Sequence, residues 1–199
     1  MSELYSSENK VLVVDKLSEK ETEDLWREYN RSFEEMQTLS PTLQIMTRED
    51  FDPAMKDSKV NKLLIKNGDT IESALIYSKI NISDKYFPWI SLKYFEHNWP
   101  EKFSEENIYY FVGLFSTPES SGLGNVYALR DKLFEKVENE SPNGAMFVYD
   151  CCDHNKGLAE MLHFMAEDYM ENVSSNPWSV DTLNNMGSQT FYSIEMKPN

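Results

Sequence analysis

The sequence predicts an α/β (α+β) fold in a single domain that spans residues 1–199, with six or seven strands flanked by helices. Two observations predict this class. Short β-branched or aromatic runs alternate along the chain with segments whose apolar residues recur at helical spacing. The chain also has no internal repeat and no linker long enough to divide it, and 199 residues suit one hydrophobic core.

The first half of the chain is predicted to form a strand, two helices and a hairpin. Ser18 followed by Glu21 has the spacing of a capping box, which begins a helix, and Thr47 followed by Asp50 begins a second one. The turn at Asn67-Gly68-Asp69 joins two runs of alternating apolar residues. The expected elements are a strand at 11–14, helices over 19–36 and from 47, and hairpin strands at 60–66 and 70–80.

The stretch 81–107 is rich in aromatic residues, and we interpret it as a strand at 90–95 flanked by ordered loops. Its rings are predicted to anchor the core; the other interpretation is that they wall an acceptor pocket, because pockets are largely apolar. From Ile108 the pattern becomes strand, glycine loop, helix, strand, helix. The expected elements are strands at 108–115, 145–150 and 190–196, and helices at 125–137, capped by Asn125, at 157–170 and at 180–186.

The chain is acidic, with 34 acidic and 19 basic side chains and a formal net charge of −15. A protein that binds nucleic acid without regard to sequence needs a basic face, and attachment to anionic lipid needs one too. We therefore predict neither a nucleic-acid partner nor a membrane partner. The acidity is uneven, because residues 107–137 contain equal numbers of basic and acidic side chains.

The location predicted from the sequence is the cytoplasm. The longest apolar run, Tyr109–Phe115, is seven residues long and is typical of a buried strand rather than of a membrane span. The N-terminus has no basic segment leading into an apolar one, as a signal peptide would. Cys151 and Cys152 are adjacent and point to opposite sides of an extended chain, so we expect no disulfide between them.

One short segment groups five side chains of types that bind metals: Asp150, Cys151, Cys152, Asp153 and His154. Alternation along an extended segment divides these side chains between two faces, and no second Cys/His pair with ligand spacing exists elsewhere. We therefore predict no metal. A nucleophilic cysteine with His163 as its partner is disfavoured as well, because a cysteine at a strand end is more often a small hydrophobic residue.

A glycine-rich run, Glu119-Ser120-Ser121-Gly122-Leu123-Gly124, lies between the expected strand at 108–115 and the helix that follows it. The free N–H groups and positive dipole at a helix start bind anions, most often phosphates, although two glycines here are also ordinary turn chemistry. The order of elements and this run resemble the GNAT superfamily of acyl-CoA-dependent N-acyltransferases. That family has Gln or Arg, two residues, Gly, one residue, then Gly or Ala. Both glycines match, whereas Glu119 stands where the family has Gln or Arg.

The resemblance implies a central, mixed and mostly antiparallel sheet, with acetyl-CoA or another acyl-CoA as co-substrate. It implies that the loop and helix start hold the pyrophosphate. It also implies that the main chain of the strand pairs with the pantetheine arm, in a gap between the strands at 108–115 and 145–150. The residues implied to contact the co-substrate are Leu114, Phe115, Ser116, Ser121, Gly122, Leu123, Gly124, Asn125 and Asn155.

The implied chemistry is direct attack of an amine on a thioester, which needs a neutral amine and a route for its proton. Leu162 stands where the family has a tyrosine, but positioning supplies much of the acceleration, so this difference does not exclude catalysis. No carboxylate lies within 108–115. The catalytic candidates are Glu96, His97, Glu105, Glu106 and Tyr169.

The sequence therefore predicts a cytoplasmic N-acyltransferase, a monomer or homodimer, that moves an acyl group, expected to be acetyl, to a small-molecule or peptide amine. The acidic segments would attract a cationic acceptor. The alternative is an inactive GNAT-like binding or interaction module, which Glu119 and the missing tyrosine favour.

Overall fold

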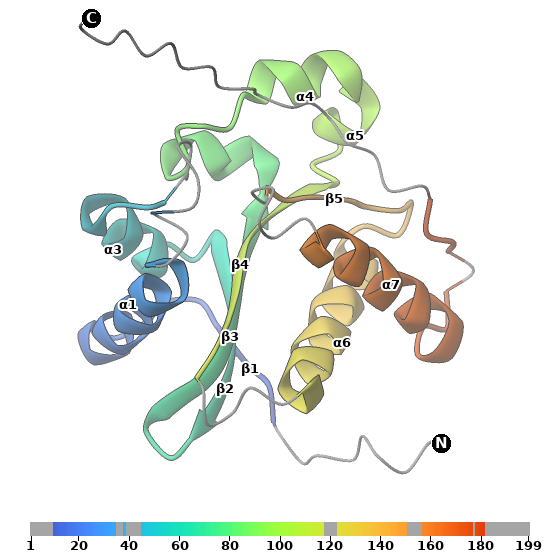
Figure 1. Cartoon of the computed structure of the whole chain (residues 1–199). Helices are drawn as coiled ribbons and strands as arrows, with labels where there is room; N and C mark the ends of the chain where they lie inside the picture. Colours follow the sequence, from blue (N-terminus) through green and yellow to red (C-terminus); the bar gives the residue numbers. More distant parts are fainter. Residues whose placement is uncertain are drawn as a thin grey trace, which may run out of the picture.

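A computed structural model of the chain (Figure 1) describes residues 10–34, 38, 45–117, 123–150, 157–176 and 178–181. Within these ranges, five strands form one sheet in the order β1-β2-β3-β4-β5. Neighbouring strands are antiparallel except β4 and β5, which are parallel. The mixed, mostly antiparallel sheet is thus confirmed. The strands are β1 (Leu12–Val14), β2 (Val60–Asn67), β3 (Thr70–Lys79), β4 (Ile108–Ser116) and β5 (Met146–Val148).

The prediction of six or seven strands is wrong for the described residues, which form five. The segment expected as a strand at 90–95 instead starts the helix α4 (Leu92–Asn98), and α5 (Pro100–Ser104) follows it. Leu92, Phe95, Trp99 and Phe103 pack on the core at intervals of three and four residues, a helical spacing that the interpretation as a strand overlooked. The strand expected at 190–196 lies outside the described residues, as does most of the helix expected at 180–186.

Helices cover both faces of the sheet, as Figure 1 shows. One face carries α1 (Glu19–Phe33) and α3 (Arg48–Lys56), and the other carries α6 (Leu123–Glu140) and α7 (Gly157–Asn172). The short 3₁₀ helix η1 (Ile80–Lys85), α4 and α5 close one end of the sheet. Among the described residues, no helix is both long and apolar enough to cross a lipid bilayer.

Local sequence signals place the starts of α1 and α3. The predicted capping boxes are confirmed, with Ser18 and Glu21 at α1 and Thr47 and Asp50 at α3 each bonding reciprocally. The start predicted for α6 is wrong. The helix begins at Leu123, so Asn125 is its third residue and not its cap.

Two hydrophobic clusters hold the layers together, one on each face of the sheet. The cluster under α1 and α3, which we call the α1-side core, contains Leu25, Phe51 and Phe115. The cluster under α6 and α7, which we call the α6-side core, contains Leu129, Tyr109 and Tyr169. Each cluster fills the space between a helix layer and the sheet, so the sheet is buried on both sides.

Candidate functional site at the open edge of β4

The pairing between β4 and β5 is short. β4 has nine residues, but only its first three pair with β5, at Ile108 with Met146, Tyr109 with Phe147 and Tyr110 with Val148. No described residue after Val148 continues this ladder. We call the remaining six residues of β4, 111–116, the open edge. A strand edge without a neighbour presents unused N–H and C=O groups that can pair with another extended chain.

A β-bulge begins the open edge. On β3, Ile76 lies opposite Gly113 and Tyr77 lies opposite Phe111, so Val112 is an extra residue on β4. The bulge changes which side chains face which layer. Tyr110 before it and Phe115 after it both enter the α1-side core, although they lie five positions apart and would face opposite sides of a regular strand. Bulges of this kind bend a strand and end its pairing, which explains why β5 leaves β4 here.

Hydrogen bonding at the end of β4 shows which backbone groups face outward. The N–H of Thr117 donates to the carbonyl oxygen of Glu72 at 2.9 Å, and these residues lie next to the directly opposed pair Ser73 and Ser116. Because bonded and non-bonded pairs alternate along antiparallel strands, Phe115 bonds to β3, whereas Leu114 and Ser116 direct their N–H and C=O groups to the open edge. Every second residue at this end of the open edge, Leu114 and Ser116, therefore directs its backbone N–H and C=O groups away from β3.

The start of α6 is tied to the end of β4 through side chains. The Asn125 amide donates to Ser73 Oγ at 3.0 Å, and Ser73 Oγ lies 3.1 Å from Ser116 Oγ. Asn125 and Ser73 are both buried, so this contact fixes the first turn of α6, with Leu123 and Gly124, beside the open edge. Three of the residues predicted to contact the co-substrate, Ser121, Gly122 and Asn155, lie outside the described residues, as does Glu119.

An arginine from α1 reaches the same place. The Arg31 guanidinium donates to the Ser116 carbonyl oxygen at 3.0 Å and pairs with the Glu28 carboxylate at 2.7 Å. The end of the open edge thus has a cation beside it, in addition to the start of α6. Beside these groups lies a shallow, open depression between α1, the start of β3 and the end of β4, which is too small for a drug-sized ligand.

A carboxylate lies at the point where β5 leaves β4. Tyr110 donates a short hydrogen bond from its hydroxyl to Asp150 Oδ1, and the Trp89 indole N–H donates to the Tyr110 hydroxyl oxygen at 3.0 Å. Asp150 is exposed as a whole residue, but the protein around its carboxyl group removes hydration, and this raises the pKa of Asp150 above its ordinary value. The hydrogen bond from Tyr110 opposes that rise only in part.

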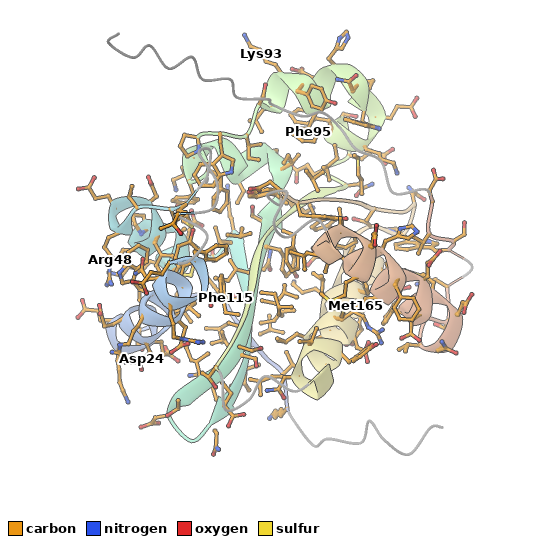
Figure 2. The ribbon with its side chains drawn as sticks, in the orientation of Figure 1. Asp24, Arg48, Lys93, Phe95, Phe115 and Met165 are labelled. Carbon is orange, nitrogen blue, oxygen red and sulfur yellow. The ribbon has the colours of Figure 1, made fainter. Side chains whose placement is uncertain are left out.

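Tyr29 of α1 belongs to the same group. Burial raises the pKa of Tyr29 to about 12, and the negative charge of Asp150 contributes to the rise. The Tyr29 hydroxyl accepts a hydrogen bond from the Met46 N–H at 2.9 Å, and its ring centroid lies 5.6 Å from that of Phe115. Figure 2 places Phe115 between the sheet and α1, so Tyr29 and Asp150 lie on the α1 side of the sheet.

The structure places four of the predicted catalytic side chains away from the open edge. Glu96 and His97 are exposed on α4. Glu105 Oε2 accepts from the Asn107 amide at 2.9 Å, and Glu106 Oε1 accepts from the Asn81 amide at 2.6 Å. Glu105 and Glu106 precede β4, so they lie at the opposite end of this strand from Leu114 and Ser116.

Tyr169, the fifth candidate, is buried between α6 and α7. Its hydroxyl donates to Glu138 Oε2 at 3.2 Å, and its ring centroid lies 5.0 Å from that of Phe134. Burial raises the pKa of Tyr169 to about 12, and Glu138 adds to the rise. These contacts are those of a side chain that joins two helices.

Sequence reasoning missed Tyr110, Trp89 and Arg31, and it considered Asp150 only as a metal ligand. A signal for Asp150 was present, because it ends the expected strand at 145–150 and lies two residues after Val148, on the same face. No local signal pointed to Arg31, which lies 85 positions before Ser116 in the sequence.

Within the described ranges, no three His, Cys, Asp or Glu side chains gather as metal ligands would. Residues 151–154 of the segment considered for metal lie outside those ranges.

No protein family model matches the sequence, and no curated protein matches it. Solved structures do match, and one acetyltransferase structure among them shares the fold of this chain, which confirms at the level of the fold the resemblance drawn from the sequence. One of them is an aminoglycoside acetyltransferase from an uncultured soil metagenomic sample in complex with trehalose. It has a TM-score of 0.50 and 10% identity, and the alignment covers 94% of this chain and 99% of that chain.

Two further structures are similar at lower scores. The same soil acetyltransferase in complex with sisomicin has a TM-score of 0.47 and 9% identity, covering 94% of this chain and 96% of that chain. A ribosomal-protein-alanine N-acetyltransferase from Brucella melitensis biovar Abortus 2308 has a TM-score of 0.45 and 12% identity, covering 89% and 99%.

Proposed function

We propose that the protein is an N-acyltransferase that binds an acyl-CoA, with acetyl-CoA as the expected donor, along the open edge of β4 and transfers the acyl group to an amine. The observation that carries this proposal is the end of the β4–β5 ladder at Tyr110, followed by the bulge at Val112. The pantetheine arm is an extended chain with two amides, and the open edge offers the outward backbone groups of Leu114 and Ser116 to such a chain.

The residues around the open edge also fit the charge of coenzyme A. The pyrophosphate would lie at the start of α6, at Leu123 and Gly124, because the first N–H groups of a helix have no carbonyl partner within the helix. Arg31 is held beside the same end of β4 by its bond to Ser116 and supplies a positive charge from α1.

The proposed reaction joins the amine nitrogen to the thioester carbonyl carbon and breaks the carbon–sulfur bond. The acyl-CoA supplies the activated thioester, and the protein holds it at a fixed distance from the amine, which accounts for much of the rate. The acceptor is proposed to be a small-molecule or peptide amine.

Calorimetry with acetyl-CoA tests the proposal. We expect binding to the wild-type protein and none to Gly124→Val, because a β-branched side chain in the first turn of α6 blocks close approach of the pyrophosphate. The matched control is Glu135→Val, which places the same side chain on the exposed face of α6. It should bind as the wild type does. A wild-type protein that binds nothing at millimolar acetyl-CoA would instead be the inactive binding module.

A further inference from the structure

We propose that Asp150 is the catalytic base of this reaction, binding a cationic primary amine through its carboxylate and accepting the proton that the amine must lose. This inference rests on the proposed function and names the acceptor class and the proton route. It starts from the hydrogen-bonded chain that runs from Trp89 through Tyr110 to Asp150.

The position of Asp150 suits this role. Val148 is the last residue of β5 that pairs with β4, and Asp150 follows it by two residues, so its carboxylate lies where the two strands separate. Tyr110, to which it is bonded, is the last residue of β4 before the open edge. A thioester held along the open edge would therefore lie beside the end of β5, close to this carboxylate.

The side from which an amine can approach follows from the two cores. Leu114 and Phe111 turn toward the α6-side core, which α6 and α7 cover. Tyr110 and Phe115 turn toward the α1-side core, and Asp150 is bonded to Tyr110 on that side. Asp150 is exposed as a whole residue although its carboxyl group is partly dehydrated, so an acceptor from solution can reach it. The acceptor is thus expected to approach on the α1 side.

The chemistry around Asp150 favours a cation. The titratable groups that face it are Tyr110 on β4 and Tyr29 on α1, and both are neutral at physiological pH because burial raises the pKa of each. Among the described residues, no lysine or arginine pairs with Asp150. A carboxylate that no described lysine or arginine neutralises attracts an ammonium group through its charge.

Two protons leave the acceptor nitrogen during the proposed transfer. The acceptor binds as an ammonium ion and gives one proton to the Asp150 carboxylate, which leaves the nitrogen lone pair free. That lone pair forms the bond to the thioester carbon, and the electrons of the carbon–sulfur bond pass to sulfur. The second proton of the nitrogen goes to the departing thiolate, and Asp150 releases its proton to solvent, so the net reaction releases one proton.

Asp150→Asn and Tyr110→Phe each keep the shape of the original side chain, and together they separate a catalytic role of Asp150 from a structural one. The assay is release of free coenzyme A thiol from acetyl-CoA, with ethanolamine, putrescine, spermidine, sisomicin and a short peptide with a free N-terminus as acceptors. For the amines that the wild type uses, Asp150→Asn should lower kcat by about 100-fold or more at pH 7, as for loss of a general base. Its affinity for acetyl-CoA should stay within about twofold of wild type, because only the proton acceptor has been removed.

Glu171→Gln is the matched control, because it removes one exposed carboxylate from α7. It should leave both quantities unchanged. Tyr110→Phe adds a readout that a merely structural role would not move. The Tyr110 hydroxyl stabilises the ionised form of Asp150, so loss of this hydroxyl in the variant raises the pKa of Asp150 further. The acidic limb of the kcat/KM profile should therefore move to higher pH.

Each contrary result has its own meaning. An Asp150→Asn protein that transfers acetyl groups at the wild-type rate overturns the role of Asp150 and leaves the acyltransferase proposal standing. A wild-type protein that binds acetyl-CoA but acetylates none of the amines overturns the proposed acceptor class. A wild-type protein without affinity for acetyl-CoA overturns the proposed function itself.

Discussion

Glu21 stabilises the start of α1 in two ways. It completes the capping box with Ser18, and its carboxylate forms a short ion pair with Lys66 of β2. The hydrogen bonds to Lys66 and Ser18 lower the pKa of Glu21 to about 2. Because the folded-state pKa lies below the unfolded one, this stabilisation is present above about pH 4.5 and is lost as the pH falls toward 2.

Glu21→Gln tests this assignment, since glutamine can keep the cap but not the charge. We expect the variant to lose about 1 kcal/mol of unfolding free energy at pH 7, discounted for the partial exposure of the pair. The difference from wild type should shrink steadily between pH 4.5 and 2 in urea unfolding experiments. Glu19→Gln removes an exposed acid from the same turn and should show no such convergence. A Glu21→Gln deficit that is constant with pH would contradict the ion-pair assignment.

The sequence reveals contacts between residues that lie close together along the chain. Both capping boxes could be predicted, because three residues separate their partners. Tyr110 and Asp150 lie 40 positions apart and Arg31 and Ser116 lie 85 apart, so their contacts depend on the tertiary fold. No spacing rule within a segment reaches that far, which is why the catalytic candidates named from the sequence did not include Asp150.

At the scale of elements, β4 determines the shape of the site. Gly113 follows the bulge, and a Cβ atom there would lie 2.6 Å from the Phe115 ring. That ring is buried and packs edge-on against Phe33 and Tyr29. The glycine is therefore required because the ring of Phe115 folds back over the strand.

Gly113→Ala should displace the Phe115 ring and lower the free energy of unfolding by about 1–3 kcal/mol, the usual cost of overpacking. It should also weaken acetyl-CoA binding, because the displaced ring distorts the open edge. Gly157→Ala is the control, since a Cβ at the start of α7 meets nothing within 4 Å, and its stability should change by less than about 0.5 kcal/mol. Denaturant titration measures both. If Gly113→Ala were as stable as wild type, the packing described for Phe115 would be incorrect.

The elements could be predicted where their periodicity is unambiguous. The hairpin of β2 and β3 and the strand β4 were expected within a residue or two of their observed bounds. The helix α4 was not predicted. The aromatic residues of 90–98 have a high strand propensity but a helical spacing, and the segment folds as the spacing indicates. The bulge at Val112 could not be predicted either, since it is visible only as a shift against β3.

For the whole molecule, the order of elements predicted the fold better than any single motif did. The glycine-rich run differs from the family at Glu119, and most of it lies outside the described residues, yet the mixed sheet and its two helix layers match the expected architecture. The net charge of −15 excludes a generally basic binding face. Arg31 nevertheless places a guanidinium group at the end of β4, where it is paired with Glu28 and donates to the Ser116 carbonyl oxygen.

Amide hydrogen exchange, resolved by NMR, tests the central claim, that the open edge binds an acyl-CoA by backbone pairing. With saturating acetyl-CoA, exchange at the Leu114 and Ser116 amides should slow by roughly tenfold or more, because these groups gain partners. The Phe115 amide should change far less, since it already bonds to β3. Uniform protection along β4, or no protection at Leu114 and Ser116 when the co-substrate is bound, would contradict backbone pairing between the acyl-CoA and the open edge.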